Sequence, residues 1–513
     1  MPELVADNKK IAKNTIYLYI RMFITMAIGL LTARVVFNAL GVSDYGLYNA
    51  VGGAVSMFVF LKTSLAQGTQ RFLMYSLGAG DIEQSKRVFS TSLFLHIAFA
   101  VVIFIFTEIV GLYLLQYKMT IDEGRMGAAM AVFQVSLVET IMGIIISPFC
   151  GCIIAHEKMG FIAYTSMLDV VFKLLIVYLL LVVDNVDKLI MYSIFYLAVS
   201  QIYNIAYFIY CRMKFEETHF SFQYVDTSLR KKIMSFFGWG IIGNVANMGS
   251  AQGFTILLNI FYNTTVNAAR GIAGTISGHI NSFVSNFQMA SAPQIVKLYA
   301  AGNTSGMYRL ANDTSLYSAF LFMFIAIPIF LEIDYILYIW LGSVPDHTSF
   351  FARVTIIQSL VTCLSNPHVS AIQATGHIKW LQILVGGVLL LILPVSYVLL
   401  KLHISLDIIY AVNVLPWAMA IVIRLELLRH YAHVDPLIAY RDVFLKVVCI
   451  LMLCFIPPFV MHRYMDYGLL RLIVVGLFCL LWSGNIIFWI GLPKNVRKML
   501  VSKVVERFYK GDK

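Results

Sequence analysis

Long apolar blocks recur along the whole 513-residue chain and are separated by short polar breaks. An α-helix needs ~20 apolar residues to cross the hydrocarbon core of a bilayer, and most of these blocks reach that length. The composition agrees, because 60% of the residues are hydrophobic and 13% are charged, whereas a soluble domain is roughly half apolar and a quarter charged. The sequence therefore predicts an all-α polytopic membrane protein.

The hydrophobic pattern predicts about fourteen transmembrane helices. The predicted spans cover residues 15–40, 47–76, 88–115, 128–154, 161–183, 189–211, 233–262, 271–298, 315–341, 351–375, 381–400, 408–429, 443–461 and 469–490.

The positive charges of the breaks predict an orientation. If the N-terminus lies inside, the inside segments hold roughly three times as many Lys and Arg residues as the outside segments, in agreement with the positive-inside rule. Both termini are then cytoplasmic. The net charge of +11 mainly reflects this topology, and the basic tail is expected to meet anionic lipid headgroups, with no nucleic acid as a partner.

The chain also repeats itself. Lys9 and Lys10 match Lys231 and Lys232 at a nearly constant offset that also aligns later positions. A repeat of six spans predicts two six-helix lobes in the same orientation, related by an axis along the membrane normal. The predicted domains are an N-terminal lobe (1–211), a cytoplasmic linker (212–232), a C-terminal lobe (233–431), two accessory transmembrane helices (432–491) and a basic cytoplasmic tail (492–513).

Polar side chains inside the spans are the candidate functional residues. Arg34, Lys62 and Arg71 are cations in the first two spans. Such groups usually face a water-filled cavity or a partner, although a long side chain can also reach the membrane interface. The eighth span is unusually polar, and either lines the same cavity or forms an interhelical hydrogen-bond face. Its candidate substrate-binding residues are Arg270, Asn281, Asn286, Gln288, Gln294 and Lys297.

Acidic and sulfur-containing residues add fewer candidates. Glu139 in the fourth span has no obvious local partner and is a candidate for ion coupling. Asp169 and Lys173 stand four residues apart on a helix and are expected to neutralise one another. Cys150 and Cys152 are expected to pack as small apolar residues. No catalytic motif is found, so we expect neither an enzyme nor a metal site.

Three stretches resemble a known family. The motif TARVVFNALGVSDYGLY at residues 32–48, NAARGIA at 267–273 and PQIVKLYAAGN at 293–303 are similar to the polysaccharide flippases, especially their O-antigen and capsule branch. These proteins belong to the multidrug/oligosaccharidyl-lipid/polysaccharide (MOP) exporter superfamily. The resemblance covers nearly the whole chain.

The resemblance implies a transporter that flips undecaprenyl-diphosphate-linked oligosaccharides from the inner to the outer leaflet by alternating access, for surface polysaccharide synthesis. It places the protein in the bacterial inner membrane, among membrane lipids and alongside a polysaccharide polymerase and a chain-length regulator. No cofactor is expected beyond an ion gradient or membrane potential. The related lipid II flippases carry a cationic cavity, and Lys62 and Arg34 each resemble a cavity arginine of those proteins.

Two alternative functions are compatible with the sequence. One is a multidrug or cation antiporter of the same superfamily, which would need acidic groups facing its cargo, whereas the first span has two arginines and no acid. The other is an O-antigen polymerase, which would be expected to have a large external loop with catalytic residues. The longest predicted outside break, near residues 116–127, carries none.

Overall fold

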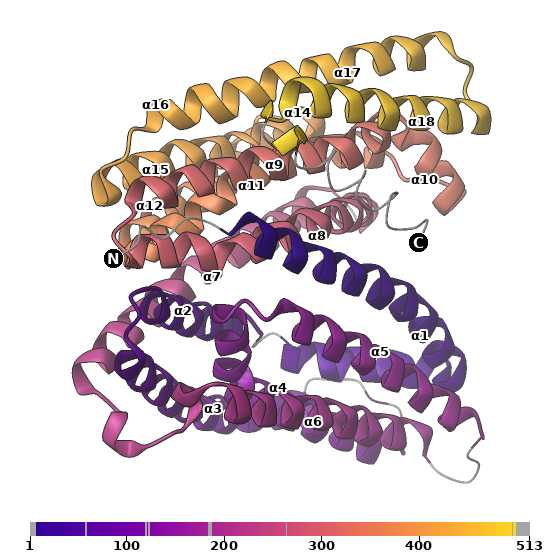
Figure 1. Ribbon diagram of the computed structural model, residues 1–513. Helices are drawn as coiled ribbons and strands as arrows, with labels where there is room; N and C mark the ends of the chain where they lie inside the picture. The colour runs from indigo at the N-terminus through magenta and orange to yellow at the C-terminus, as the bar shows by residue number, and fades with distance from the viewer. Residues whose placement is uncertain are drawn as a thin grey trace, which may run out of the picture. The chain divides into compact units, whose positions relative to one another are not determined.

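The computed structural model describes residues 7–56, 59–117, 121, 124–182, 187–262, 264–494 and 496–498. Their regular structure is helical throughout (Figure 1). The first half comprises α1 (Asn8–Ser56), α2 (Val59–Gly78), α3 (Ile82–Tyr117), α4 (Met126–Ala155), α5 (Met159–Val182), α6 (Lys188–Lys214) and the 3₁₀ turns η1 (Glu216–Thr218) and η2 (Phe222–Tyr224).

The second half is also helical. It comprises α7 (Thr227–Phe261), α8 (Thr264–Ala300), α9 (Thr304–Leu331), α10 (Ile333–Leu341), α11 (Thr348–Thr375), α12 (Lys379–Leu390), α13 (Ile392–Lys401), α14 (Leu406–Val412), α15 (Leu415–Ala432), α16 (Pro436–Ala439), the π-helix η3 (Tyr440–Leu445), α17 (Lys446–Tyr464), α18 (Leu469–Ile486) and the π-helix η4 (Ile487–Gly491).

The protein is a multi-pass membrane protein. Within the described residues, ten helical segments are long and apolar enough to cross a bilayer. The four predicted spans outside this set fall in α1, α2, α7 and α8, which include the helices that carry most of the candidate polar residues. Polar groups lower the hydropathy of these helices, and they are the ones expected to need wet or paired surroundings.

The helices form two compact units. Unit 1 combines Met1–Val245 with Ala290–Gly306, and unit 2 combines Ala246–Met289 with Met307–Lys513. The division therefore cuts through α7 and α8, so that the last part of α8 packs within unit 1. The domain boundaries predicted from the sequence remain a prediction.

In unit 1, α4 is central, because it packs against α2, α3 and α6. Its residues Phe133 and Leu137 are fully buried together with Val51 of α1 and Leu189 of α6. Gly111 of α3 permits this packing, since a Cβ atom there would overlap the ring of Phe133. The side chain of Asp187 caps α6 by accepting hydrogen bonds from the first backbone amides of that helix.

In unit 2, α17 and α18 lie side by side (Figure 1). They bury Val447, Cys454 and Val475 against Phe320 and Met323 of α9. A polar link joins the same elements, because Glu332 accepts hydrogen bonds from His462 and Arg471. The helices α17 and α18 are thus attached to the rest of unit 2 by an apolar core and by the buried carboxylate of Glu332.

Several predicted spans are interrupted in the structure. The break predicted between residues 40 and 47 is instead helical, because α1 continues to Ser56 across a kink at Gly41, whose φ of 78° only glycine adopts easily. The span predicted at 315–341 consists of α9 and α10, which meet at Glu332. The spans predicted at 381–400 and 408–429 are likewise divided, at Leu391 and at Asn413–Val414. Hydropathy does not register the breaks within predicted spans, because it is averaged over about 20 residues and one or two polar residues change that average little.

Candidate functional site

The intramembrane charges of unit 1 meet around Glu139 on α4. Ser200 on α6 donates a 3.2 Å hydrogen bond to the Glu139 carboxylate. The ammonium groups of Lys62 and Lys173 interact electrostatically with the same carboxylate, and Lys173 pairs with Asp169 at 3.0 Å. We call these five residues the unit 1 charge cluster. It balances two cations against two anions, contributed by α2, α4 and α5.

A glycine on α4 leaves room for one of these cations. A Cβ atom at Gly143 would lie 2.7 Å from the Nζ atom of Lys62. Gly143 stands one helical turn after Glu139, so both residues present the same face of α4 to the lysine. The position of the Lys62 ammonium therefore depends on the absence of a side chain at residue 143.

Arg71 on α2 lies elsewhere in unit 1, among aromatic rings. Its side chain is 8% exposed. The guanidinium carbon lies 4.6 Å from the centre of the Phe72 ring and 5.0 Å from that of Tyr75. A guanidinium over aromatic faces is stabilised by their quadrupoles. Arg71 is thus buried within unit 1 beside these two rings.

Two further candidates, Gln294 and Lys297 at the end of α8, bind Glu157. Lys297 approaches one carboxylate oxygen of Glu157 to 2.6 Å, Gln294 donates to the other at 3.1 Å, and Lys10 lies 3.3 Å away. Burial alone raises the pKa of the Glu157 carboxyl group, but the charge and hydrogen bond of Lys297 outweigh it and hold that pKa below its ordinary value. Glu157 has a φ of 59°, which costs a non-glycine residue ~1–2 kcal/mol.

Unit 2 contains a polar pocket around Arg270, which we call the Arg270 pocket. Its volume is about 260 Å³. Arg270 donates hydrogen bonds to the Thr255 hydroxyl and, at 3.0 Å, to the Ala251 carbonyl oxygen. Its guanidinium also lies 5.2 Å from the Phe254 ring. The residues that line the pocket are Asn247, Ser250, Ala251, Phe254, Arg270, Gln358, Ile392, Tyr410, Asn413 and Trp417.

The lining of the Arg270 pocket indicates its chemistry. None of these lining residues is acidic, and Arg270 is the one cation among them. Three side-chain amides and two hydroxyl groups offer hydrogen bonds to uncharged polar groups. Three aromatic rings supply flat apolar faces. The pocket is thus suited to an anion that carries hydroxyl-rich groups, whereas a cationic ligand would meet Arg270 without a carboxylate.

The other polar residues of α8 hydrogen-bond to neighbouring backbone and side chains in unit 2. Asn281 donates to Ser277 and to Ser359 of α11, at 3.2 and 3.0 Å. Gln288 donates to the carbonyl oxygen of Cys363, also on α11, at 2.9 Å. Asn286 is buried and donates to the backbone within α8 at 2.9 Å. The bonds of Asn281 and Gln288 to α11 correspond to the interhelical alternative considered for this span.

The predicted site residues therefore fall into five groups, three in unit 1 and two in unit 2. Lys62 interacts electrostatically with Glu139, Gln294 and Lys297 share Glu157 as a partner, and Arg71 lies beside the rings of Phe72 and Tyr75. The side chain of Arg34 lies outside the described residues. Sequence reasoning missed Glu157, which stands in a loop, and the pocket residues Phe254, Tyr410 and Trp417. Asn413 lines this pocket and is a polar residue inside a predicted span, so the sequence could have pointed to it.

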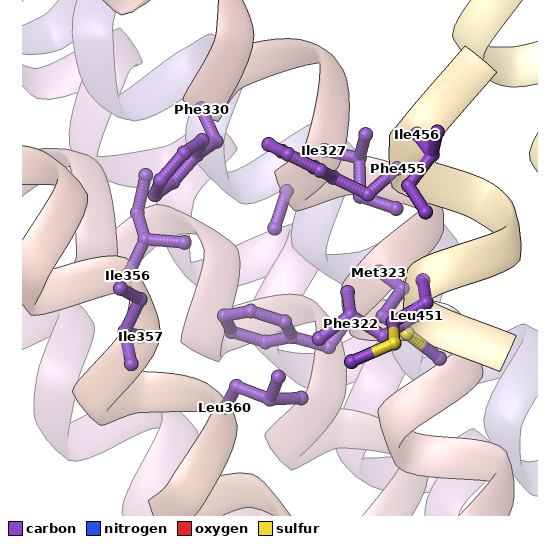
Figure 2. Close-up of a pocket in the computed structure, with 12 residues that line it drawn as sticks. Phe322, Met323, Ile327, Phe330, Ile356, Ile357, Leu360, Leu451, Phe455 and Ile456 are labelled. Atoms are coloured by element: carbon purple, nitrogen blue, oxygen red, sulfur yellow. The ribbon is translucent and has the colours of Figure 1, made fainter. Parts of the chain in front are cut away.

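A second pocket of unit 2 is apolar. It has a volume of about 280 Å³ and lies between α9, α11 and α17 (Figure 2). Side chains such as Phe322, Phe330, Ile356 and Phe455 surround it, and no polar group lines it (Figure 2). Its lining residues offer no hydrogen bond or charge to a ligand, so this pocket is not suited to the polar ligand that the Arg270 pocket would take.

Comparison with known proteins identifies the fold. No protein-family model and no curated protein matches the chain. Among solved structures, the chain is similar to an outward-facing multidrug resistance MATE family transporter of the MOP superfamily, with a TM-score of 0.69 at 14% sequence identity, covering 83% of this chain and 96% of that chain. It is also similar to the MATE transporter ClbM in complex with Rb⁺, with a TM-score of 0.67, 17% identity and coverage of 84% and 96%.

A third similar structure is a MOP superfamily transporter from Pyrococcus furiosus, for which a reversed polarity of the binding pocket suggests a different function. It has a TM-score of 0.66 and 13% identity, covering 84% of this chain and 96% of that chain. The chain therefore has the helical fold of MATE transporters of the MOP superfamily, and these neighbours are transporters. At such low identity the likeness establishes the fold and leaves the cargo open.

Proposed function

We propose that this protein is a transporter of the MOP superfamily that moves its cargo across the membrane by alternating access. Its fold is that of solved MATE transporters. Charged and amide side chains occur in both units at positions within predicted spans, where such groups usually serve substrate or ion pathways. An ion gradient or the membrane potential would supply the energy.

The comparisons by themselves support a multidrug or cation antiporter better than an oligosaccharide flippase. The similar structures include a multidrug resistance transporter and a transporter that holds Rb⁺. The unit 1 charge cluster adds the carboxylates Glu139 and Asp169, which an antiporter could use to bind a cation or proton. Any other proposed function must therefore be tested against that of a multidrug or cation antiporter.

The Arg270 pocket carries our proposal of a different cargo, an undecaprenyl-diphosphate-linked oligosaccharide. A diphosphate must cross ~30 Å of hydrocarbon, which is unfavourable unless cations and water accompany it. Arg270 offers a planar guanidinium that suits phosphate oxygens. The amides and aromatic rings around it suit sugar rings. The Pyrococcus furiosus transporter, with its reversed pocket polarity, provides a precedent within the fold for a departure in function.

The proposed setting follows from this cargo. The protein would lie in a bacterial inner membrane with both termini in the cytoplasm. A polysaccharide polymerase and a chain-length regulator would act on the flipped oligosaccharide at the outer leaflet. Membrane lipids would surround the helices and accommodate the polyprenyl tail.

A deletion strain distinguishes the two cargo classes. We expect loss of the gene to abolish surface polysaccharide, measured by gel and by binding of a glycan-specific lectin, and to leave drug sensitivity unchanged. Complementation with the wild-type gene should restore the glycan. Complementation with Arg34→Glu, Lys62→Glu or Arg270→Glu should restore at most about a tenth of it, because an added carboxylate repels the diphosphate.

The exposed Lys9 provides the control, since Lys9→Glu makes the same charge change outside the candidate sites. Immunoblots of membrane fractions must show equal amounts of every variant. Full complementation by all three charge-reversal variants would refute the cationic pathway. Normal surface polysaccharide together with increased drug accumulation in the deletion strain would establish the antiporter instead.

A further inference from the structure

Three side chains of metal-binding type meet at the end of α4 in unit 1. Cys152 lies in the last turn of α4, His156 follows that helix directly, and Glu217 lies in η1. The Nε2 atom of His156 is 2.5 Å from a carboxylate oxygen of Glu217, and the Sγ atom of Cys152 is 3.3 Å from the same oxygen. The three potential ligand atoms lie within 4.8 Å of one another.

Two features of the fold bring this cluster together. Cys152 and His156 are four residues apart, so the helical turn places both on one face. The chain after α6 then returns through η1, which packs against α3 and α6, and this places Glu217 beside them. The ring of Phe215 stacks on the His156 imidazole at 4.0 Å, which holds the imidazole plane in place.

The cluster is closed on one side and open on the other. Cys152 is fully buried and Glu217 is 2% exposed. The His156 side chain is 26% exposed, so an ion could enter from its side. None of these three residues belongs to the unit 1 charge cluster or to the Arg270 pocket, so the candidate transport sites do not account for them.

We propose that Cys152, His156 and Glu217 form a binding site for a divalent transition metal ion, with Zn²⁺ as the best fit. One thiolate, one imidazole and one carboxylate match the borderline-soft ligand preference of Zn²⁺, and they disfavour Ca²⁺ and Mg²⁺, which take oxygen ligands. Metal–ligand distances of about 2.0–2.3 Å separate tetrahedral ligand atoms by about 3–4 Å, so the carboxylate moves slightly away from His156.

Metal binding replaces the thiol S–H bond of Cys152 with a metal–sulfur bond. The Cys152 thiol releases its proton to solvent as the metal–sulfur bond forms, and the neutral imidazole of His156 takes the tautomer with its proton on Nδ1. Its Nε2 atom and the Glu217 carboxylate then each donate a lone pair to the metal. A water molecule on the exposed side of His156 completes four-coordination. The metal then joins η1 to the end of α4, fixing the start of the segment predicted to link the two lobes. This inference is independent of the transported cargo.

Metal binding by the purified full-length protein tests the proposal. The protein in detergent is stripped with a chelator and titrated with Co²⁺, whose bonds to thiolate give a near-ultraviolet charge-transfer band, and then with Zn²⁺ in competition with a chromogenic chelator. We expect a single high-affinity Zn²⁺ per chain and a cobalt–thiolate band. Cys152→Ser should remove the band, and His156→Ala should weaken Zn²⁺ binding at least about tenfold.

Cys150→Ser is the matched control, because Cys150 lies on the same helix outside the cluster and should leave binding unchanged. If the cysteine variants fail to fold, X-ray absorption at the zinc edge of the wild-type protein decides. One sulfur with nitrogen and oxygen neighbours supports the site. The proposal is overturned if zinc is bound only by nitrogen and oxygen, is bound by several sulfurs, or is not retained. It is also overturned if Cys150→Ser loses binding as much as Cys152→Ser does.

Discussion

Single residues in the membrane part of unit 1 are stabilised by partners distant in sequence. Glu139 has no close charged neighbour along its own helix, yet Ser200 of α6 donates a hydrogen bond to it, and Lys62 of α2 and Lys173 of α5 interact with it electrostatically. A carboxylate at membrane depth is strongly unfavourable unless such groups surround it. The charge cluster therefore links α2, α4, α5 and α6, and a small change at one position should affect the others.

Gly143 provides the most selective test of this cluster. A methyl group at this position would overlap the Lys62 ammonium, which lies at the end of a flexible side chain and can move away. We therefore expect Gly143→Ala to reduce transport activity several-fold while the melting temperature of the purified protein changes little.

Gly127→Ala is the matched control, because Gly127 lies on the same helix and a Cβ atom there meets no other group within 4 Å. Equal transport by Gly127→Ala and Gly143→Ala would show that the exact position of the Lys62 ammonium does not matter. A large loss of thermal stability in Gly143→Ala would show instead that Lys62 cannot relax.

Glu139 is also our candidate for ion coupling. Glu139→Gln keeps the shape of the side chain and removes its charge, so transport should lose its dependence on the ion gradient. Transport into vesicles, measured with and without an imposed proton or Na⁺ gradient, checks this. Glu426→Gln, an exposed carboxylate of α15, should respond to the gradient like the wild type. A gradient response that persists in Glu139→Gln would exclude this role.

Whole elements of unit 2 depend on a buried ion pair. Glu332 stands between α9 and α10 and is fully buried. His462 at the end of α17 donates to it at 2.7 Å, and Arg471 at the start of α18 donates at 3.2 Å. Arg353 and Asp334 form a further pair nearby at 2.6 Å. The hydrogen bonds to Glu332 fix the ends of the two accessory helices against the end of α9, and the Arg353–Asp334 pair joins α11 to α10.

Glu332→Ala should loosen these two helices. Removing one partner of a buried pair leaves the other charge uncompensated and typically destabilises a protein by about 3–5 kcal/mol. We expect a clearly lower melting temperature and faster proteolysis between α16 and α18. Glu426→Ala removes an exposed pair with Arg429 and should shift the melting temperature much less. Equal shifts in the two variants would contradict a structural role of Glu332.

The whole molecule has an internal division that the hydropathy pattern does not reveal. The end of α8 packs within unit 1, where Gln294 and Lys297 bind Glu157, while residues 264–289 of the same helix belong to unit 2. One continuous helix thus takes part in both compact units. Its two groups of polar residues have different partners, Glu157 in unit 1 and α11 in unit 2.

The orientation of the whole chain is also testable. The excess of Lys and Arg in alternate breaks predicts that both termini are cytoplasmic. Alkaline phosphatase fused after residue 513 should be inactive, and green fluorescent protein at the same place should fluoresce. Alkaline phosphatase inserted between residues 116 and 127 should be active. The opposite pattern would reverse the predicted topology and with it the proposed direction of transport.

The number and approximate positions of the spans were predictable, because hydropathy is a local property of about 20 consecutive residues. The pairing of Asp169 with Lys173 was predicted for a similar reason, since a helical turn alone brings them together. Breaks within spans, at Glu332 or Leu391, were not predicted, because they do not alter the average hydropathy around them.

The sequence by itself determined that this chain is a helical membrane protein with polar residues inside several spans. Only the tertiary structure decided the partners of those residues: Lys62 beside Glu139, Lys297 with Glu157, Arg270 in an acid-free pocket, and Cys152 with His156 and Glu217. The physical reason is that membrane insertion depends on the composition of each segment. Polar pairing depends on which helix faces meet, and these faces belong to segments that are far apart in the chain.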